Sequence, residues 1–384
     1  MRFEFATATR IVFGAGTVQE AATAAQEMGR RVFLATGSSP ERRRHVADDL
    51  QDHGVSVTAF AVGREPDISL VREGRELALA EGCDLVIAIG GGSVIDAGKA
   101  IAALMTNEGA PADYLEVVGK GRTISQPPAP FIAVPTTAGT GSEVTRNAVL
   151  ASTEHRTKAS MRSPMMLPRL AVVDPELTYD VPPAITAGTG LDALTQLIEP
   201  YVSLRGNPVT DALCLDGMRR VSRSLRRAYL EGRDASARAD MSLASLLGGI
   251  ALANAGLGVV HGFAAPIGGM FGAPHGATCA ILLGPGMEAN IRALRERAPG
   301  SECLARYRRV AATLVGKPDA EPEDGPAFVR GLCAELSIPR LRSCGIGQTD
   351  VEPLVEKASG TSSMKGNPIA LTHQELTAAL LQAL

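Results

Sequence analysis

The sequence has little net charge of either sign. Its 384 residues include 38 lysines and arginines against 41 aspartates and glutamates, which gives a formal net charge of −3 at pH 7. Proteins that bind nucleic acid usually carry a strongly basic face. The arginine-rich stretches at 41–45 and 219–229 are read more simply as solvated helix faces. We therefore expect no nucleic-acid partner.

Long apolar runs and paired cysteines are also absent. No segment offers about 18 consecutive apolar residues, and the N-terminus has no apolar run of the signal-peptide type. The cysteines are scattered without a CxxC pair, which is typical of free thiols in a reducing compartment. These absences predict a soluble, cytoplasmic protein with no membrane partner and no disulfide. The cysteines are Cys83, Cys214, Cys279, Cys303, Cys333 and Cys344.

Two hydrophobic patterns divide the chain. Up to about residue 180, short runs such as RVFLAT (31–36) and LVIAIG (85–90) alternate with amphipathic stretches, which is typical of βαβ crossovers in a parallel sheet. From about residue 185 nearly everything follows the helical period of 3.6. With 45% hydrophobic residues, the chain suits two domains. We predict a doubly wound parallel α/β domain over 1–182 and an all-α helical domain over 183–384.

A glycine-rich loop follows one of the expected strands. The segment IAIGGGSVIDAGKAIA (87–102) places Gly90, Gly91 and Gly92 before a helix that carries Ser93 and Asp96. Glycines let the backbone approach a pyrophosphate, and the first N–H groups of the helix point at it. The pattern predicts a diphosphate site, although it is not the spaced GxGxxG of the common dinucleotide folds. A tight turn without a ligand is the alternative.

A second loop, AVPTTAGTGSEVT (133–145), follows another expected strand. The hydroxyls of Thr136, Thr137, Thr140 and Ser142 suit a ribose, an adenine edge or a phosphate oxygen. Alone, the loop could be a plain turn. Two such loops at the carboxyl ends of strands in one open sheet mark the crevice in which these folds bind ligands, so together they favour a dinucleotide.

The stretch GLDALTQLIEPYVS (190–203) raises the question of a metal site. At helical spacing, Asp192 and Gln196 lie on one face one turn apart, where two side chains can converge on a single point. A histidine at position 196 would make this half of a metal site. Glutamine leaves open whether the chain carries a working metal centre, a reduced one or only its outline.

Six segments are similar in order and spacing to the iron-containing (group III) alcohol dehydrogenase family: GGGSVIDAGKA, PTTAGTGSEVT, KASMRSPMMLPRLAVVDPEL, GLDALTQLIE, VVHGFAAPIGG and APHGATCAILL. The resemblance covers essentially the whole chain. It implies a dinucleotide-binding domain, a helical domain, and hydride transfer between a nicotinamide cofactor and a small alcohol or carbonyl compound in the cleft between them. It also implies that Gly91, Gly92, Ser93 and Asp96 hold the pyrophosphate and nicotinamide side, that Thr136, Thr137 and Ser142 border the cofactor, and that Lys158 reaches its ribose.

The family binds a divalent metal through four side chains, which fall here on Asp192, Gln196, His261 and His275. Three match, and the glutamine replaces a histidine. Ala265 stands where a further histidine, usually placed in a proton path, is common. The resemblance thus makes Asp192, His261 and His275 candidate catalytic residues as well as metal ligands.

One carboxylate and two imidazoles are a sufficient ligand set for catalytic zinc or Fe(II). The glycerol dehydrogenases, which resemble this family more distantly, use such a set, and Gln196 could add its amide oxygen. The alternative is that His261 and His275 are only polar residues of a helical core. Cys279 follows His275 by one turn but lies in the apolar run CAILL, so we expect it in the core.

The end of the strand at 31–36 bears on the choice of cofactor. Many relatives place an aspartate there, whose carboxylate binds ribose hydroxyls and repels a 2′-phosphate. Here the residue is Gly37, followed by Ser38, Ser39 and three arginines at 42–44. The chain lacks the carboxylate that would repel a 2′-phosphate, and its serines and arginines add hydrogen-bond donors. Both differences predict that NADP(H) is preferred over NAD(H). The alternative is that the arginines only solvate a helix, which would leave the enzyme indifferent.

Two other functions remain open. A dehydroquinate synthase-like lyase shares this architecture in outline, but it needs several lysines and arginines around its substrate, and no such cluster stands near the candidate metal ligands. A catalytically decayed nucleotide-binding protein is suggested by Gln196 and Ala265, whereas the intact cofactor loops count against it. For the enzyme we expect a small alcohol, aldehyde or keto acid as substrate. We also expect a homodimer, because MRFEFATATRIVF offers a strand to a neighbour.

Overall fold

The computed structural model describes residues 2–38, 40–152, 154–155 and 157–384. The chain forms two compact units. One contains residues 7–137 and 141–178, and we call it the α/β unit. The other, the helical unit, contains the N-terminal residues up to Ala6, the segment Ala138–Thr140 and the chain from Tyr179 to Leu384. Each unit has a hydrophobic core of its own.

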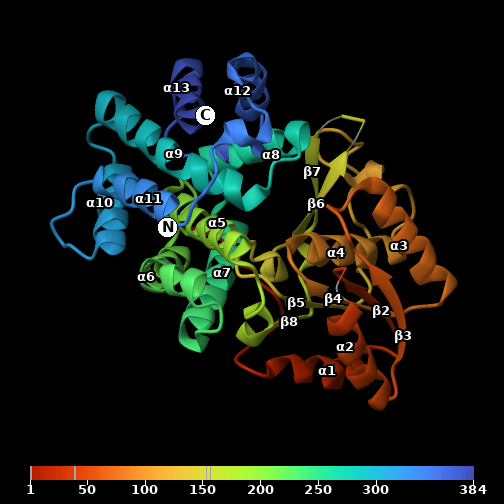
Figure 1. Ribbon diagram of the computed structural model, residues 1–384. Helices are drawn as coiled ribbons and strands as arrows, with labels where there is room; N and C mark the ends of the chain where they lie inside the picture. Colours follow the sequence, from red (N-terminus) through yellow and green to blue (C-terminus); the bar gives the residue numbers. More distant parts are fainter. Residues whose placement is uncertain (1, 39, 153, 156) are drawn as a thin grey trace. The chain divides into compact units, whose positions relative to one another are not determined.

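A six-stranded parallel sheet is the centre of the α/β unit (Figure 1). Its strand order is β1-β8-β5-β4-β2-β3. Helices make crossovers between parallel strands, as this topology requires. The strands are β1 (Arg10–Phe13), β2 (Arg31–Thr36), β3 (Ser56–Ala61), β4 (Leu85–Gly90), β5 (Phe131–Pro135) and β8 (Leu170–Val173); the helices are α1 (Glu20–Met28), α2 (Pro40–Asp52), α3 (Ile68–Ala80) and α4 (Gly92–Thr106).

Alternating side chains of the strands build a core on each face of this sheet. In β2, Val32 and Leu34 pack in the core that includes α1, whereas Phe33 and Ala35 pack in the core that includes α3 and α4. A strand that is covered on both faces buries both sets of its side chains. The doubly wound α/β architecture predicted from the sequence is confirmed.

An antiparallel hairpin accompanies the parallel sheet. It consists of β6 (Asn147–Ser152) and β7 (Thr157–Arg162). The hydrophobic pattern of this half of the chain predicts only parallel strands, so the hairpin is a difference from that prediction. Ala148, Leu150, Ala159 and Met161 are buried in the core of α3 and α4. The intervening residue in β6, Val149, is apolar, so this strand lacks a clear alternation of polar and apolar residues.

The helical unit is organised around α5 (Pro183–Val202), in which every residue from Thr186 to Val202 except Thr189 is buried. Side-chain oxygens cap several of its helices, among them Asn207 at α6 and Thr372 at α13. The predicted all-α domain is confirmed. Its further helices are α6 (Pro208–Leu230), α7 (Ala235–Ala255), α8 (Val259–Phe271), α9 (His275–Arg297), α10 (Glu302–Val315), α11 (Asp324–Glu335), α12 (Val351–Ser359) and α13 (His373–Ala383).

Membrane-spanning helices were sought within the described residues. No helix there has by itself both the length and the apolar composition to cross a bilayer. The helices α7 and α8, which are bent by 100° at the break between them, are long and apolar enough only when they are taken together. This result rests on length and composition alone.

The N-terminal segment differs from the strand expected over its whole length. Among the described residues of this segment, 2–13, only Arg10–Phe13 form a strand, which lies at the edge of the sheet and pairs with β8. Ala6 is instead held by the side-chain amide of Asn254, which accepts from its N–H at 2.7 Å and donates to its carbonyl at 2.8 Å. An amide side chain offers one donor and one acceptor side, so it takes the place of a neighbouring strand at this residue.

Candidate active site

The first glycine loop joins β4 to α4. β4 ends at Gly90, Gly91 caps the helix, and Gly92 and Ser93 are its first residues. A Cβ atom on Gly90 would lie 2.5 Å from Cγ2 of Val94, so only glycine fits where the strand turns into the helix. The backbone N–H groups of Gly92 and Ser93 therefore lie at a helix N-terminus, where the helix dipole favours an anion.

The second loop begins at the neighbouring strand. β5 lies beside β4 with Pro135 opposite Gly90, so the two strands end at the same edge of the sheet. The backbone N–H of Thr136 donates to the carbonyl of Gly90 at 2.9 Å. Thr136 is buried and Thr137 is half-buried. The structure thus brings together the two loops that the sequence singled out and ties one to the other.

Asp96 on α4 is bound to Ser142 on the second loop. The Ser142 hydroxyl donates a hydrogen bond to Oδ1 of Asp96, and the N–H of Val149 donates to Oδ2 at 2.9 Å. Lys99, one turn further along α4, donates from Nζ to the carbonyls of Ser142 and Asn147, both at 2.8 Å. Two residues that the resemblance assigns to the cofactor therefore also fix the second loop against α4.

Burial dominates the ionisation of this network. It lowers the pKa of Lys99 to about 8, against the opposing effect of Asp96 and Glu143. It raises the pKa of Glu143 to about 7. Glu143 lies in a 3-10 turn at Ser142–Val144 and is 2% exposed. Desolvation disfavours the charged forms of Lys99 and Glu143, so both side chains change their charge close to neutral pH.

The end of β2 supplies the candidate contacts for the adenosine end of a cofactor. β2 lies beside β4 with Thr36 opposite Ile89, so Gly37 and Ser38 follow at the same sheet edge as the two loops. A Cβ atom on Gly37 would meet nothing within 4 Å, and Ser38 is exposed. Ser39 and the side chains at 42–44 lie outside what the structure describes. The described part of this edge presents no carboxylate at 37 or 38.

Lys158, on β7, is ion-paired. Its Nζ lies 2.9 Å from Oε2 of Glu65, and its side chain is only 12% exposed. The resemblance assigns this lysine to the cofactor ribose. A ribose would have to share the ammonium group with Glu65 or displace that carboxylate.

Four ligand-type side chains converge inside the helical unit. Asp192 comes from the middle of α5, His261 from the first turn of α8, and His275 and Cys279 from the first two turns of α9. One donor atom from each lies within 4.8 Å of all the others. The Nε2 atoms of His261 and His275 lie 3.4 and 3.7 Å from Oδ1 of Asp192. We call these four residues the α5-α8-α9 cluster.

Two buried oxygens on α5 lack a hydrogen-bond partner among the described residues. They are Oδ1 of Asp192 and Oε1 of Gln196, on side chains that are 1% and 3% exposed. A buried polar atom without a partner costs about 1–3 kcal/mol, and a cation would satisfy it. Carboxylate, imidazole and thiolate are all ligands of zinc. The residues present therefore fit a divalent metal.

A second carboxylate orients one of the two histidines. Nδ1 of His261 donates to Oε2 of Glu199 at 2.7 Å, and the N–H of Val260 donates to Oε1 at 2.7 Å. With Nδ1 engaged, Nε2 faces Asp192, the arrangement that commonly orients metal-binding histidines. Sequence reasoning missed Glu199, although it lies two turns after Asp192 on the same side of α5.

Electrostatic interactions within the α5-α8-α9 cluster shift its pKa values. The adjacent Cys279, with a further contribution from Asp192, raises the pKa of His275 to about 9. Burial would lower the pKa of His261, but Cys279 and Asp192 raise it well above its usual value. Burial would likewise raise the pKa of Asp192, and the two imidazoles hold it below its usual value. Metal binding to these imidazoles must therefore displace protons.

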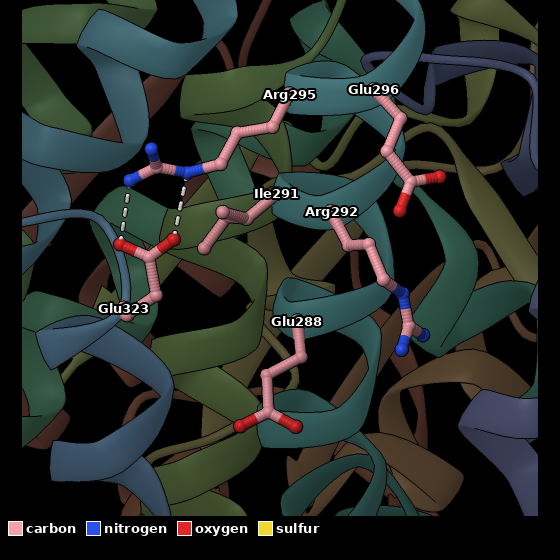
Figure 2. A pocket seen from close by; sticks show the side chains of 6 residues that line it. All are labelled: Glu288, Ile291, Arg292, Arg295, Glu296 and Glu323. Carbon is pink, nitrogen blue, oxygen red and sulfur yellow. Dashed lines mark hydrogen bonds and ion pairs between the residues drawn. The ribbon is translucent and has the colours of Figure 1, made fainter.

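A depression between the later turns of α9 and Glu323, the residue before α11, is lined almost entirely by charged side chains (Figure 2). Arg295 is paired with Glu323 at 2.8 Å, as the dashed lines show. Glu288 is paired with Arg330. Because these opposite charges satisfy one another, the depression offers no concentrated charge to a ligand.

Comparisons with known proteins identify the family. Residues 8–175 match the family model for iron-containing alcohol dehydrogenase, and residues 186–384 match the model for the C-terminal part of the Fe-containing alcohol dehydrogenase family. The chain belongs to the iron-containing alcohol dehydrogenase family. It is an oxidoreductase of the alcohol dehydrogenase type, and members of this family use NAD(P) and a metal.

Individual relatives cover most or all of this iron-containing alcohol dehydrogenase. Alcohol dehydrogenase 4 of Schizosaccharomyces pombe is 38% identical over 87% of this chain and 77% of its own. The 1,3-propanediol dehydrogenase of Klebsiella pneumoniae is 36% identical over 92% of each chain. The crystal structure of a 1,3-propanediol oxidoreductase matches with a TM-score of 0.91, 34% identity and complete coverage of both chains.

Proposed function

We propose that this enzyme interconverts small alcohols with aldehydes or keto acids, with assistance from a divalent cation and with NADP(H) preferred over NAD(H). One observation carries the proposal: Asp192, His261 and His275 converge on a carboxylate oxygen that is buried without a hydrogen-bond partner. Oδ1 lies 3.4 and 3.7 Å from the Nε2 atoms of His261 and His275, and a cation held between these three atoms would supply the partner that this buried oxygen lacks.

In this proposal Asp192, His261 and His275 hold the cation, and Glu199 keeps the proton of His261 on Nδ1 so that Nε2 is the binding atom. When bound, the cation polarises the substrate oxygen and the nicotinamide dinucleotide supplies or accepts the hydride. Gln196 adds at most a neutral amide oxygen. Ala265 carries no titratable group, so the substrate oxygen exchanges its proton with water.

The cofactor contacts are part of the same proposal. The diphosphate binds at the N-terminus of α4, where Gly91, Gly92 and Ser93 present the backbone. Asp96 and Ser142 hold the second loop in place, and Thr136 and Thr137 border the nucleotide. Lys158 reaches the ribose by sharing its charge with Glu65. Gly37 leaves room for a 2′-phosphate, the exposed Ser38 can donate to it, and Ser39, which lies outside the described residues, follows in the sequence with a second hydroxyl; these features support the preference for NADP(H).

Metal removal tests the proposal. Protein purified without chelator should contain zinc or iron by elemental analysis, and it should consume NADPH with at least one member of a panel of small aldehydes and keto acids. Chelation should abolish turnover, and added Zn²⁺ or Fe²⁺ should restore it. Full turnover in chelator by metal-free protein would refute the role of the cation. Binding of NADPH without turnover of any substrate would point to a decayed enzyme.

The roles of the two domains and the oligomeric state are further parts of the proposal. Residues 1–182 bind the dinucleotide, and residues 183–384 hold the metal and the substrate. We propose a homodimer, supported by the exposed apolar side chains of Phe3 and Phe5, which are 48% and 37% exposed. Light scattering at micromolar concentration should give twice the chain mass of 39.9 kDa. A monomer mass would exclude the dimer.

A further inference from the structure

We propose that the thiolate of Cys279 is the fourth protein ligand of the metal and replaces the imidazole that Gln196 does not supply. The inference rests on the proposed metal site at Asp192, His261 and His275. The family resemblance implies one carboxylate and three imidazoles as ligands, whereas this chain would supply one carboxylate, two imidazoles and one thiolate.

The contacts of Cys279 distinguish it from other buried cysteines of this unit. Cys303 donates from Sγ to the carbonyl of Val202 at 3.8 Å, and Cys333 donates to the carbonyl of Ala280 at 3.3 Å. Such bonds to backbone carbonyls satisfy a thiol that only fills space. Sγ of Cys279 instead faces Nε2 of His275 at 3.6 Å and Nε2 of His261 at 3.9 Å.

The spacing of the donor atoms matches a tetrahedral site. With bonds of about 2.0 Å to nitrogen or oxygen and about 2.3 Å to sulfur, tetrahedral zinc separates nitrogen from sulfur by about 3.5 Å and nitrogen from oxygen by about 3.3 Å. The nitrogen–sulfur distances are 3.6 and 3.9 Å, and the nitrogen–oxygen distances are 3.4 and 3.7 Å. Right-angled octahedral coordination would need about 3.0 and about 2.8 Å from the same bond lengths, so the tetrahedral arrangement fits better.

Cys279 and His275 are held in place by one helix. They lie four residues apart at the start of α9, so their side chains project from the same face. Cys279 is fully buried. A thiolate there requires a compensating positive charge, which the metal supplies, and the thiol proton is released to solvent on binding.

A thiolate ligand makes the site select among metals. Sulfur is a soft donor that suits zinc and cobalt in tetrahedral geometry, whereas iron in oxidoreductases of the carboxylate and histidine type is bound by harder ligands. It also adds one negative charge to the ligand set. Nitrogen and oxygen ligands already favour zinc over Fe²⁺. We therefore expect stripped protein exposed to equal Zn²⁺ and Fe²⁺ under anaerobic conditions to prefer zinc by a wider margin than the Cys279→Ser variant does.

Cobalt substitution gives a spectroscopic test that does not depend on activity. Stripped protein is reloaded with Co²⁺, and its near-ultraviolet and visible absorption is recorded. A thiolate ligand should produce an intense sulfur-to-cobalt charge-transfer band in the near-ultraviolet and strong visible bands of tetrahedral Co²⁺. The wild-type spectrum alone decides whether a thiolate is bound, so the test survives a variant that fails to fold.

Three variants assign the band. Cys279→Ser and Cys279→Ala should abolish the band, while the remaining ligands still bind Co²⁺ more weakly. The loss of affinity should exceed the roughly 10–100-fold that is typical when a residue hydrogen-bonded to a metal ligand is removed. Cys303→Ser, a buried thiol bonded to a carbonyl, is the matched control and should keep the band. Cobalt bound by the wild type without a charge-transfer band would overturn the role of Cys279 and leave the metal site intact. No cobalt binding by any protein would overturn the metal site as well.

Discussion

Glu199 accepts a 2.7 Å hydrogen bond from Nδ1 of His261, and the two residues are 62 positions apart in the sequence. The carboxylate comes from the long buried helix α5 and the imidazole from the start of α8. Because Nδ1 donates, Nε2 is turned toward the other side chains of the α5-α8-α9 cluster. This contact decides which nitrogen of the imidazole can bind a metal.

Replacing Glu199 with glutamine should weaken metal binding about 10–100-fold. The amide oxygen can still accept from the N–H of Val260, but its NH₂ group then faces Nδ1, which favours the tautomer with the proton on Nε2. Zinc affinity, measured by competition with a chromophoric chelator, checks this. Glu323→Gln at the start of α11, where the carboxylate pairs with Arg295, is the control and should bind zinc like the wild type. Equal affinity in Glu199→Gln would show that the tautomer is set elsewhere.

Replacing Gln196 with methionine should stabilise the metal-free protein. The side chain is 3% exposed and its Oε1 lacks a partner, and methionine has a similar shape without a polar oxygen to desolvate. The gain should be about 1 kcal/mol or more. Urea unfolding in the presence of chelator measures it, and Gln348→Met on the exposed surface should stay within about 0.5 kcal/mol of the wild type. A loss of stability in Gln196→Met would mean that the amide has a partner.

Replacing Gly37 with aspartate should shift cofactor preference from NADPH toward NADH. A Cβ atom at this position meets nothing within 4 Å, so the substitution adds a charge without a clash. The carboxylate repels a 2′-phosphate and accepts from ribose hydroxyls. We expect the ratio of kcat/KM for NADPH to that for NADH to fall at least about tenfold, or about 1.4 kcal/mol.

Gly37→Asn separates this charge effect from a change of shape. The neutral side chain has nearly the same size as aspartate, so it should leave the ratio close to that of the wild type. A wild-type enzyme that prefers NADH tenfold would refute the predicted preference for NADP(H). Equal shifts in the two variants would show that the charge at position 37 does not set the preference.

Replacing Glu143 with glutamine should stabilise the protein above neutral pH. The folded pKa of about 7 exceeds the ordinary value of 4.5 because the carboxyl is buried. A raised carboxyl pKa contributes stability that is fully present below pH 4.5 and is lost as pH rises through 7. The advantage of the variant should therefore grow across this window, to at most about 3 kcal/mol. Urea unfolding of both proteins from about pH 5 to about pH 8 measures the trend, and a constant difference would contradict it.

The sequence predicted those parts of the site that depend on local pattern. The loop at Gly90–Gly92 follows from a buried strand next to a helix. Asp192, His261 and His275 follow from the resemblance, and the structure brings them together. Cys279 was expected in the core because its neighbours are apolar. Helical spacing showed that it shares a face with His275 but not what that face meets, which is fixed by the packing of α5 and α8 against α9.

The same limit applies to Glu199 and the β6–β7 hairpin. Glu199 lies on the side of α5 that carries Asp192, but its partner His261 comes from a helix far along the chain. The hairpin was missed because a strand in a small antiparallel pair has a weak alternating pattern, and the core that it covers is built by other elements. Contacts between segments that are distant in the sequence determine both the Glu199–His261 pair and the hairpin. A single sequence shows only local patterns, so it cannot reveal such contacts.

The α5-α8-α9 cluster also has a mechanical consequence. Its side chains come from three helices, with long stretches of chain between the first and the second. An ion held by all three closes these loops as a cross-link would. The six cysteines are all free thiols, so the protein has no covalent bond in that role. Heating the stripped enzyme should therefore release α8 and the start of α9 from α5 before the rest of the helices melt, and the loaded enzyme should come apart in a single step.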